Sequence, residues 1–310
     1  VAGVATGGVT AVAVNVTTVA PEAAGFVQLL AAGSDAVASY SNVNTDAGGQ
    51  VRANFAIVPV GDGGAISIYA SGAGDVVIDV LGYFTATATA TTAGRLVRLD
   101  EPQRALDTRD SAALASGDRR AIPMPTGVDA NEISGLVVTV TGTQATAPGW
   151  VQADPTASPA VVGTTSTINL GPGENVANLA IVPVNGGASV SAYFADGGSG
   201  HVIVDIVGYI TSDAAPAATS GLYVSLFPFR TYDSADALTG REQVRVTTAG
   251  VPADASAVVL NLTVVGAARP GFARVWSAAA AEPATSALNW SAAGEIRAAA
   301  AITAVSSGAA

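Results

Sequence analysis

The chain lacks several residues on which much protein chemistry depends. Its 310 residues include no cysteine and no lysine, so all 13 basic residues are arginine, and histidine occurs once. The absence of cysteine excludes disulfides, thiolate metal sites and thiol nucleophiles. The absence of lysine excludes Schiff-base chemistry and amide crosslinks from lysine to asparagine. The fold must therefore be stabilised by non-covalent contacts.

Charge is also scarce, and what there is has mainly one sign. Only 12% of the residues are charged, and the net charge is −11. Such a field repels phosphate backbones and anionic lipids, so we expect no nucleic-acid partner. Gly, Ser, Thr and Asp interrupt every apolar stretch before it reaches the length of a membrane span, so we expect no membrane insertion. The hydrophobic content of 49% is ample for buried cores.

The most informative feature that is present is internal repetition. GDVVIDVLGYF at 74–84 returns as GHVIVDIVGYI at 200–210, and NFAIVPV at 54–60 returns as NLAIVPV at 178–184. A degenerate third copy of the second motif, AAAITAV, stands at 299–305. A Gly-aromatic pair and an S-x-x-N motif each occur three times, at 25–26, 149–150 and 271–272, and at 41–44, 166–169 and 286–289. Recurrence in a fixed order predicts a repeat protein.

The spacing of the motifs sets the expected boundaries. We predict a partial repeat over 1–84 that lacks the opening segment, a linker over 85–95, a complete repeat over 96–211, a linker over 212–221, and a partial repeat over 222–310 that lacks the closing strands. The linkers are rich in Thr, Ala and Pro, which favours extended connectors. Incomplete end repeats predict either a longer natural chain or completion by strand addition from neighbouring protomers.

The fold class follows from the complete repeat, in which short β-branched runs alternate with turn residues. The runs are VRLDEP from 97, a run near Ile122, LVVTVTG, WVQAD, TINL, NLAIVPV, VSAYF and HVIVDIVGYI. This pattern is typical of all-β, antiparallel β-sandwich or barrel-like modules, here joined in tandem by short linkers. The Ala-rich segments near 278–281 and 298–301 favour helix by propensity, but their register in the repeat predicts a loop and a strand.

Two local sequence patterns lead to further structural predictions. In the run from 11, Val12, Val14 and Val16 alternate with Asn15 and Thr17, which predicts a strand that buries one face only. The Gly-rich stretches GDGG at 61–64 and DGGSG at 196–200 lead into no helix, so we interpret them as hairpin turns and not as phosphate-binding loops.

Asp79 and Asp205 occupy matched positions inside apolar runs. A partly buried carboxylate is costly without a cationic partner, and arginine offers a bidentate one. The candidates are Arg104, Arg109 and Arg230. We predict that Asp205 pairs with Arg104 or Arg109 and so ties the first strand of a repeat to its last; simple exposure at an edge, or a functional acid, are the alternatives.

The remaining acidic residues and the histidine give little support for a functional site. Asp107 and Asp110 share one short loop, a spacing that fits neither the facing carboxylates of a glycosidase nor the oxygen series of a calcium loop. We predict no catalytic residue, no metal and no cofactor, with calcium as the weak alternative. His201 lies near Ser199, but its matched residue is Asp75, which favours a solvent-facing strand end over a catalytic dyad.

Aromatic residues supply the candidate contact positions. Phe26, Trp150 and Phe272 are matched, and we predict that they pack in a core. If instead they are exposed, Trp150 can contact a ligand or neighbour, as can Trp276 and Trp290 of the last repeat.

Taken in order, RALDTR at 104–109, the VVTVT or VLNLT strand, VANLAIVPV and HVIVDIVGYI resemble a β-rich repeat that occurs in tandem in secreted, cell-wall-associated proteins of actinobacteria and some other bacteria. The resemblance covers essentially the whole chain and implies an extracellular, cell-surface or cell-wall location and a modular β architecture. It brings no catalytic residues. The third repeat departs from the pattern, with FRTYDSA at 229–235 in place of RALDTRD.

We therefore expect a non-enzymatic extracellular structural protein, a repeat-built component of a surface layer, stalk or filament that associates with itself through contacts between β modules. The alternative is a set of carbohydrate-binding or adhesive modules accessory to a cell-wall enzyme, with cell-wall polysaccharide as the partner.

Overall fold

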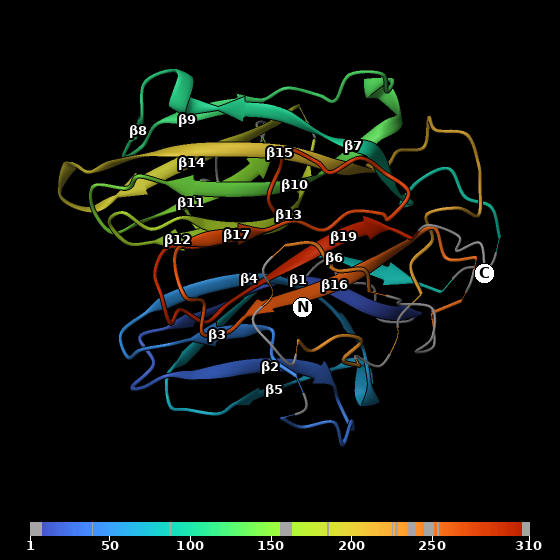
Figure 1. Cartoon of the computed structure of the whole chain (residues 1–310). Coiled ribbons are helices and arrows are strands. Elements are labelled where there is room, and N and C mark those ends of the chain that lie inside the picture. Colours follow the sequence, from blue (N-terminus) through green and yellow to red (C-terminus); the bar gives the residue numbers. More distant parts are fainter. Residues whose placement is uncertain are drawn as a thin grey trace.

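The computed structural model describes residues 8–305 except 39, 87–88, 156–162, 185, 225, 227–228, 235–237, 239, 245–250 and 253. These residues are nearly all in strands, turns and loops, and we group the strands into three units (Figure 1). Unit 1 contains β1 (Val9–Val19), β2 (Gly25–Ala31), β3 (Val43–Thr45), β4 (Val51–Pro59), β5 (Ile66–Ala70) and β6 (Asp75–Thr85). Unit 2 contains β7 (Leu96–Asp107), β8 (Leu114–Ala115), β9 (Arg119–Ile122), β10 (Ile133–Thr143), β11 (Gly149–Pro155), β12 (Ile168–Leu170), β13 (Val176–Pro183), β14 (Ala188–Phe194) and β15 (Ser199–Thr211). Unit 3 contains β16 (Ala257–Val264), β17 (Gly271–Ala273), β18 (Leu288–Trp290) and β19 (Arg297–Ala304).

Among the described residues the helical content consists of single 3-10 turns: η1 (Asp62–Gly64), η2 (Thr108–Asp110), η3 (Ala130–Glu132) and η5 (Ala195–Gly197). A search of the described residues finds no helix with the length and apolarity of a membrane span.

The sheets are antiparallel, and their strand orders match between units. In unit 2 one sheet has the order β13-β10-β15-β7 and the other β12-β11-β14-β9. In unit 1 the corresponding sheets are β4-β1-β6 and β3-β2-β5, and in unit 3 they are β16-β19 and β17-β18. Unit 2 buries one apolar cluster between its sheets, with Val138 of β10 and Val204 of β15 on one side and Val151 and Val190 on the other. Unit 1 has a smaller cluster of the same kind.

All the strands expected in the segment 96–211 are present, so the prediction of an all-β antiparallel fold is confirmed. Alternating β-branched residues with turn residues between them account for this success. The two Ala-rich segments also follow the prediction, since 278–281 is not helical and 298–301 lies within β19. Here pairing of β19 with β16 overrides the helix propensity of alanine.

The predicted hairpins at the Gly-rich turns are wrong. GDGG connects β4, which pairs with β1, to β5, which pairs with β2. DGGSG likewise connects β14 to β15, which belong to different sheets. A turn that passes from one sheet to the other uses the same left-handed glycines as a hairpin, here Gly63 and Gly197 with φ of 66° and 71°. Turn composition alone cannot separate the two connections.

The predicted one-sided burial of β1 is also wrong. Val14 and Val16 lie in the core of unit 1 as expected, but Ala13, Asn15 and Thr17 on the opposite face are also buried, with exposed fractions of 1%, 4% and 5%. A second apolar cluster covers this face and draws residues from all three units: Ala13 and Phe55, Val137 and Leu179, and Ala300.

This second cluster places the three units around one shared interior. β4, β13 and β19 carry the NFAIVPV, NLAIVPV and AAAITAV motifs, and each of these strands contacts the other two. In Figure 1, β19 and β16 (red and orange) lie between the green strands of unit 2 and the blue strands of unit 1. The matched residues Phe55, Leu179 and Ala300 meet there. We call this region the junction.

The two connectors between the units, 85–95 and 212–221, contact each other. Thr91 and Ala218 form a β-bridge between the two connectors. Arg95, only 5% exposed, donates to the carbonyl oxygens of Thr91, Pro216 and Ser220 at 2.7–3.2 Å. The guanidinium of Arg95, at the end of the first connector, thus binds carbonyl groups of both connectors.

Candidate functional site

The junction contains the most elaborate polar structure in the described part of the chain, and its first element is an asparagine pair between units 1 and 2. Asn178 of β13 is fully buried, and its Oδ1 accepts the Phe55 backbone N–H at 2.8 Å. Its Nδ2 donates to Asn15 Oδ1 at 2.9 Å and to the Thr167 carbonyl at 2.8 Å. Asn15 in turn donates to the Ser166 carbonyl at 2.6 Å. Each buried polar group is thereby matched across the interface.

The same arrangement recurs between units 3 and 1. Asn54 Oδ1 accepts the Ala300 backbone N–H at 2.9 Å, and Asn54 Nδ2 donates to Asn261 Oδ1 at 2.9 Å and to the Asn42 carbonyl at 2.6 Å. Asn261 donates to the Ser41 carbonyl at 2.7 Å. Ser41 and Ser166 are the first residues of S-x-x-N motifs. The motif therefore presents a carbonyl to the neighbouring unit.

The third corner of the junction has neither asparagine. Sheet register matches Thr139 to Asn15 and Asn261, and motif alignment matches Ala299 to Asn54 and Asn178. Both members of the pair are replaced together. If only one asparagine of the pair were replaced, the other would be buried without its hydrogen-bond partner. The two positions therefore differ together from those at the other corners.

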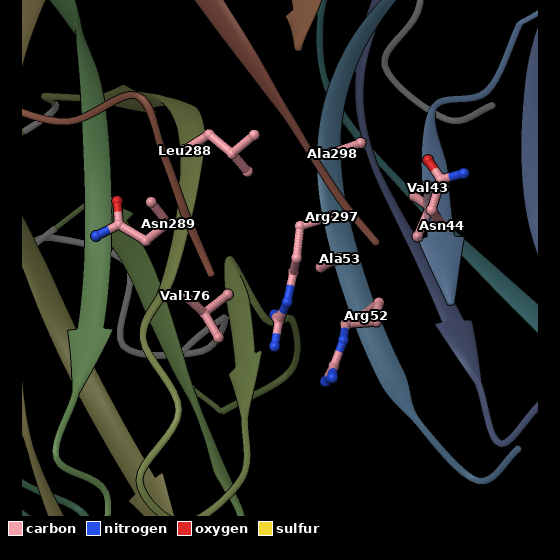
Figure 2. Close-up of a pocket in the computed structure, with 10 residues that line it drawn as sticks. Val43, Asn44, Arg52, Ala53, Val176, Leu288, Asn289, Arg297 and Ala298 are labelled. Carbon is pink, nitrogen blue, oxygen red and sulfur yellow. The ribbon is translucent and has the colours of Figure 1, made fainter. Parts of the chain in front are cut away.

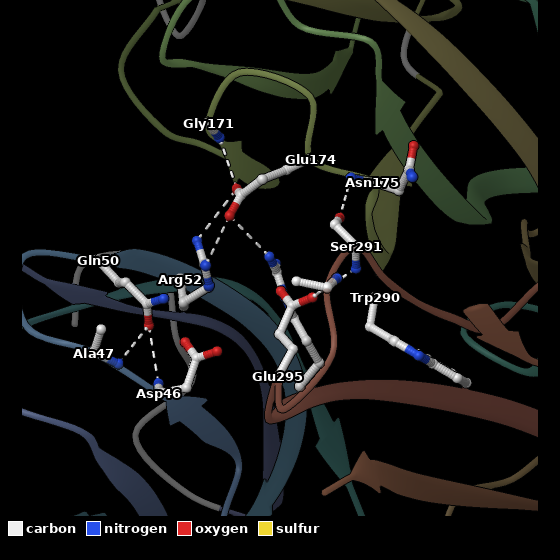
Figure 3. Close-up of polar contacts among 12 residues, drawn as sticks. Asp46, Ala47, Gln50, Arg52, Gly171, Glu174, Asn175, Trp290, Ser291 and Glu295 are labelled. Carbon is white, nitrogen blue, oxygen red and sulfur yellow. Dashed lines mark hydrogen bonds and ion pairs between the residues drawn. The ribbon is translucent and has the colours of Figure 1, made fainter. Parts of the chain in front are cut away.

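A charged network closes one end of the junction (Figure 3). Glu174 of unit 2 reaches Arg52 of β4 at 2.9 Å and Arg297 of β19 at 3.1 Å, so one carboxylate joins all three units. Arg297 also pairs with Glu295. The two arginine side chains are only 9% and 5% exposed. Partners on several sides are needed to offset the cost of burying these charges.

The acidic members of this network stand at a recurring turn. Gln50, Glu174 and Glu295 occupy matched positions, and each accepts backbone N–H groups of its own loop. The Glu174 carboxylate accepts from Gly171 at 2.7 Å. Glu174 Oε2 therefore fixes its own loop and also accepts from Arg52 at 3.4 Å, while Oε1 accepts from both Arg52 and Arg297.

Electrostatics at the network follow from burial and from the paired charges. Burial alone would raise the pKa of Glu174, but Arg52, the Gly171 N–H and Arg297 outweigh it and hold that pKa below 4.5. Burial lowers the pKa of Arg52, and the nearby Arg297 lowers it further against the opposing effect of Glu174. Glu174 is thus the anion that allows two guanidinium groups to lie together.

A small cavity of about 10 Å³ lies beside these arginines (Figure 2). Its lining combines matched residues of the three units: Val43, Asn44, Arg52, Ala53, Val176, Ala177, Leu288, Asn289, Arg297 and Ala298. Within the described structure, Arg52 Nε and Arg297 Nη1 are buried donors without a protein acceptor. The volume suits a single water molecule and no larger ligand.

The charge of Glu174 makes a pH-dependent contribution to stability. Because its folded-state pKa is lowered, this contribution is complete above its unfolded pKa, near 4.5, and is lost as the pH falls through the folded value. We expect the stability difference between the wild type and Glu174→Gln to shrink as the pH is lowered below about 4.5. Urea unfolding of both proteins between pH 7 and pH 3 measures this difference. A difference that stays constant over that range would contradict the assignment.

The predicted partners Asp205 and Arg104 lie together on neighbouring strands of unit 2. Arg104 Nε of β7 donates to Asp205 Oδ1 of β15 at 2.5 Å, which ties the first strand of the unit to its last. Asp205 is 2% exposed, and burial raises its pKa despite Arg104. Arg104 also pairs with Asp107 at 2.9 Å, and Arg109 pairs with Asp107 rather than with Asp205. The Arg109 side chain is the main cause that lowers the pKa of Asp107 to about 2.

The expected arginine partner of Asp79 is absent, and that prediction is wrong for the described residues. Asp79 makes no ion pair there, and burial alone raises its pKa. Arg230 pairs instead with Asp233 at 2.7 Å, with both side chains mostly exposed. The physical reason is the sheet: β15 is flanked by β7, whereas β6 has no described strand on its outer edge.

The two matched aspartates should respond differently to truncation. Asp205→Ala removes a buried pair but leaves Arg104 with Asp107 and water, so we expect a loss of about 1–2 kcal/mol in the free energy of unfolding. Asp79→Ala breaks no buried ion pair, and a pair with the mostly exposed Arg230 would contribute less than about 1 kcal/mol, so we expect the smaller loss here. Urea denaturation of both variants tests this, and equal effects would refute the difference in pairing.

The candidate contact aromatics lie outside the main cores, so the predicted core packing of Phe26, Trp150 and Phe272 is wrong. Trp150 stacks on Tyr193 at 4.0 Å, the matched pair Phe26 and Tyr69 lies at 5.8 Å, and Phe272 is 52% exposed. Alternation along β11 points Val151 inward and Trp150 outward.

The two tryptophans of unit 3 are engaged locally. Trp276 lies 5.4 Å from the Arg241 guanidinium, and Trp290 donates its indole N–H to the Arg269 carbonyl at 2.8 Å. The Trp290 ring also lies over Gly271, where a Cβ would stand 2.7 Å from it. These contacts explain why a glycine precedes Phe272.

His201 and the acidic loop have structural partners. His201 Nδ1 lies 2.9 Å from the Thr108 carbonyl, which requires the proton on Nδ1, and 3.2 Å from Thr108 Oγ1. Asp107 is occupied by two arginines, and within the described residues no group of His, Asp and Glu side chains could hold a metal ion. No structural observation supports Asp110 as a ligand.

Sequence reasoning missed the junction. The recurrence of Asn15 with Asn261 and of Asn54 with Asn178 was visible, and it could have indicated buried side-chain pairs. Arg52 with Arg297, and Glu174 with Glu295, also recur at matched positions in two of the three units, so this signal was equally present in the sequence. The buried pair of Arg119 with Asp154 is a further ion pair within unit 2 only.

A scan against protein-family models, a search of curated proteins and a search of solved structures each return no match to this chain. Its function must therefore be argued from its own residues.

Proposed function

We propose that the chain is a non-enzymatic extracellular structural protein, built from tandem β-sandwich repeat modules and serving as a component of a cell-surface layer, stalk or filament. The observation that carries this proposal is the shared interior at the junction. Ala13, Asn15 and Thr17 are buried by neighbouring units, and two asparagine pairs and one carboxylate join the units. Asn178 and Asn54, at 0% and 1% exposed, are among the most buried polar residues described, and both bond to a neighbouring unit.

Such a body suits a mechanical role. Force applied to one unit passes to the others through buried hydrogen bonds and packed strands rather than through a single flexible linker. The low charge of the chain, and apolar residues exposed outside β6 such as Val265 and Phe272, favour association between copies. The extracellular location rests on the resemblance of the motifs to tandem repeats of secreted, wall-associated proteins.

Electron microscopy of the purified protein over a range of concentrations tests the proposal. Fibres or lattices with a regular repeat are the expected result, and a dispersed particle at all concentrations would contradict self-assembly. The adhesive alternative rests on the half-buried Trp150 stacked on Tyr193. Retention on peptidoglycan that Trp150→Ala abolishes, without assembly, would favour that alternative.

A further inference from the structure

The outer edge of β6 is built like a covered strand but is not covered by any described residue. β6 pairs with β1 on one side only, while its counterpart β15 pairs with β10 and with β7. The matched residues differ in burial as a result. Val77 and Val80 are 47% and 36% exposed, whereas Ile203 and Ile206 are 7% and 1% exposed. β6 therefore presents an apolar edge of the kind that another strand covers.

Two further residues of β6 fit a neighbouring strand. Asp79 matches Asp205, whose partner Arg104 comes from β7. Gly82 matches Gly208, where a Cβ would stand only 2.6 Å from the Val97 carbonyl oxygen of β7. At Gly82 a Cβ would meet nothing within 4 Å. Gly208 of β15 thus leaves space for the backbone of β7. Gly82 leaves the same space beside β6, but no described strand fills it.

A segment with the features of β7 lies elsewhere in the same chain. LYVSLFPFRTYD at 222–233 aligns without gaps with LVRLDEPQRALD of β7, 126 residues earlier. We call its described residues, 222–224, 226 and 229–233, the donor segment. Arg230 pairs with Asp233 at 2.7 Å just as Arg104 pairs with Asp107 at 2.9 Å. Val224, Phe229 and Tyr232 are 74%, 41% and 41% exposed, so its apolar side chains also lack cover.

The donor segment already touches the end of β6 at which pairing would begin. The rings of Tyr223 and Phe84 lie 4.5 Å apart, and burial raises the pKa of Tyr223 to about 12. In unit 2, Val97 is opposite Tyr209; shifted by 126 residues, this pair becomes Tyr223 opposite Tyr83, next to Phe84. The root of the segment thus lies at the end of β6 where antiparallel pairing would begin, and on docking the Tyr223 ring moves from the face of Phe84 to the face of Tyr83.

We propose that β6 is a strand-accepting edge and that its occupant is the donor segment of the same chain, which adds antiparallel in the register of β7 on β15. In this register Arg230 is opposite Asp79, Phe229 is opposite Val80, and Val224 passes over Gly82. The pairing unites an unpaired carboxylate with an exposed arginine and covers apolar side chains on both partners. Because Tyr223 tethers the segment, the effective concentration of the donor is on the order of millimolar or more, which favours the same chain over a second copy.

We call this pairing of the donor segment with β6 the closure. It goes beyond the proposed function, since it concerns one chain and holds whether or not the protein assembles or is extracellular. It would remove β6 from the edges that are open to other copies. The chain has no cysteine, so a pair of introduced thiols can report it without background.

Oxidation of Val80→Cys/Phe229→Cys in dilute solution is the test. We expect a disulfide within the monomer, seen as faster migration without reductant and a monomer mass. Val80→Cys/Tyr232→Cys is the control and should crosslink at least about tenfold more slowly, because Tyr232 would lie opposite Ile78, and such diagonal neighbours stand about 7–8 Å apart, beyond the span of a disulfide. Dimers linked by disulfide would assign the edge to a second copy and overturn the proposal, as would an absent crosslink or equal rates in the two variants.

A third variant separates docking from chance encounter. Gly82→Val, added to the Val80→Cys/Phe229→Cys pair, places a branched side chain where Val224 must pass. Since the space at Gly82 is open in the undocked chain, the fold should be unchanged by circular dichroism while the crosslinking rate falls at least about tenfold. An unchanged rate would contradict the register. A failed crosslink with normal fibres in the microscope would overturn the closure alone.

Discussion

Replacing Asn178 with alanine is expected to lower the free energy of unfolding by about 3–5 kcal/mol, one of the two largest effects expected for this chain. The substitution leaves the Phe55 N–H, the Thr167 carbonyl and Asn15 Oδ1 without their partner, and all lie at a buried interface. Each unsatisfied group costs about 1–3 kcal/mol. Urea denaturation followed by circular dichroism measures the loss.

Asn169→Ala is the matched control for this prediction. Asn169 is partly exposed and bonds only within its own S-x-x-N turn, to Ser166 Oγ at 3.0 Å. Its removal should cost less than about 1 kcal/mol. Similar losses in the two variants would show that the contact between units is not what makes Asn178 important.

The second large effect is expected from Glu174→Ala, again about 3–5 kcal/mol, because the substitution leaves buried positive charge without its anion. Arg297 keeps Glu295, but Arg52 keeps only the Val51 carbonyl. The Gly171 N–H also loses its acceptor. The effect should appear in equilibrium unfolding at neutral pH.

Arg52→Val supplies the comparison, since valine already stands at the matched position 176 of unit 2. Glu174 would retain Arg297 and the Gly171 N–H, so the loss should be clearly smaller than for Glu174→Ala. A loss in Arg52→Val that equals or exceeds the loss in Glu174→Ala would mean that Glu174 is not the shared anion of the network.

The sequence predicted the strands and the Asp205–Arg104 pair because both depend on local pattern and on a recurring motif. The prediction that Asp79 has an arginine partner failed for a physical reason. The partner of Asp205 comes from β7, whereas no described strand pairs with the outer edge of β6, and identity between two aspartates does not carry over their neighbours. The same difference in neighbours exposes Val77 where Ile203 is buried.

The junction was not predictable from strand periodicity. Ala13, Asn15 and Thr17 alternate with valines, which is the pattern of a strand with one face in water. Small and polar residues serve equally well on a face that packs closely against another sheet and satisfies its polar groups there. Only the recurrence of paired asparagines, lost together at Thr139 and Ala299, distinguishes the second case.

The central claim is that the units share one interior, and calorimetry of Asn178→Ala beside the wild type tests it most directly. If the junction couples the units, each protein should show one unfolding transition, and the whole transition should move to lower temperature in the variant. Several transitions in the wild type, of which the substitution moves only one, would show that the units fold independently and would contradict the claim.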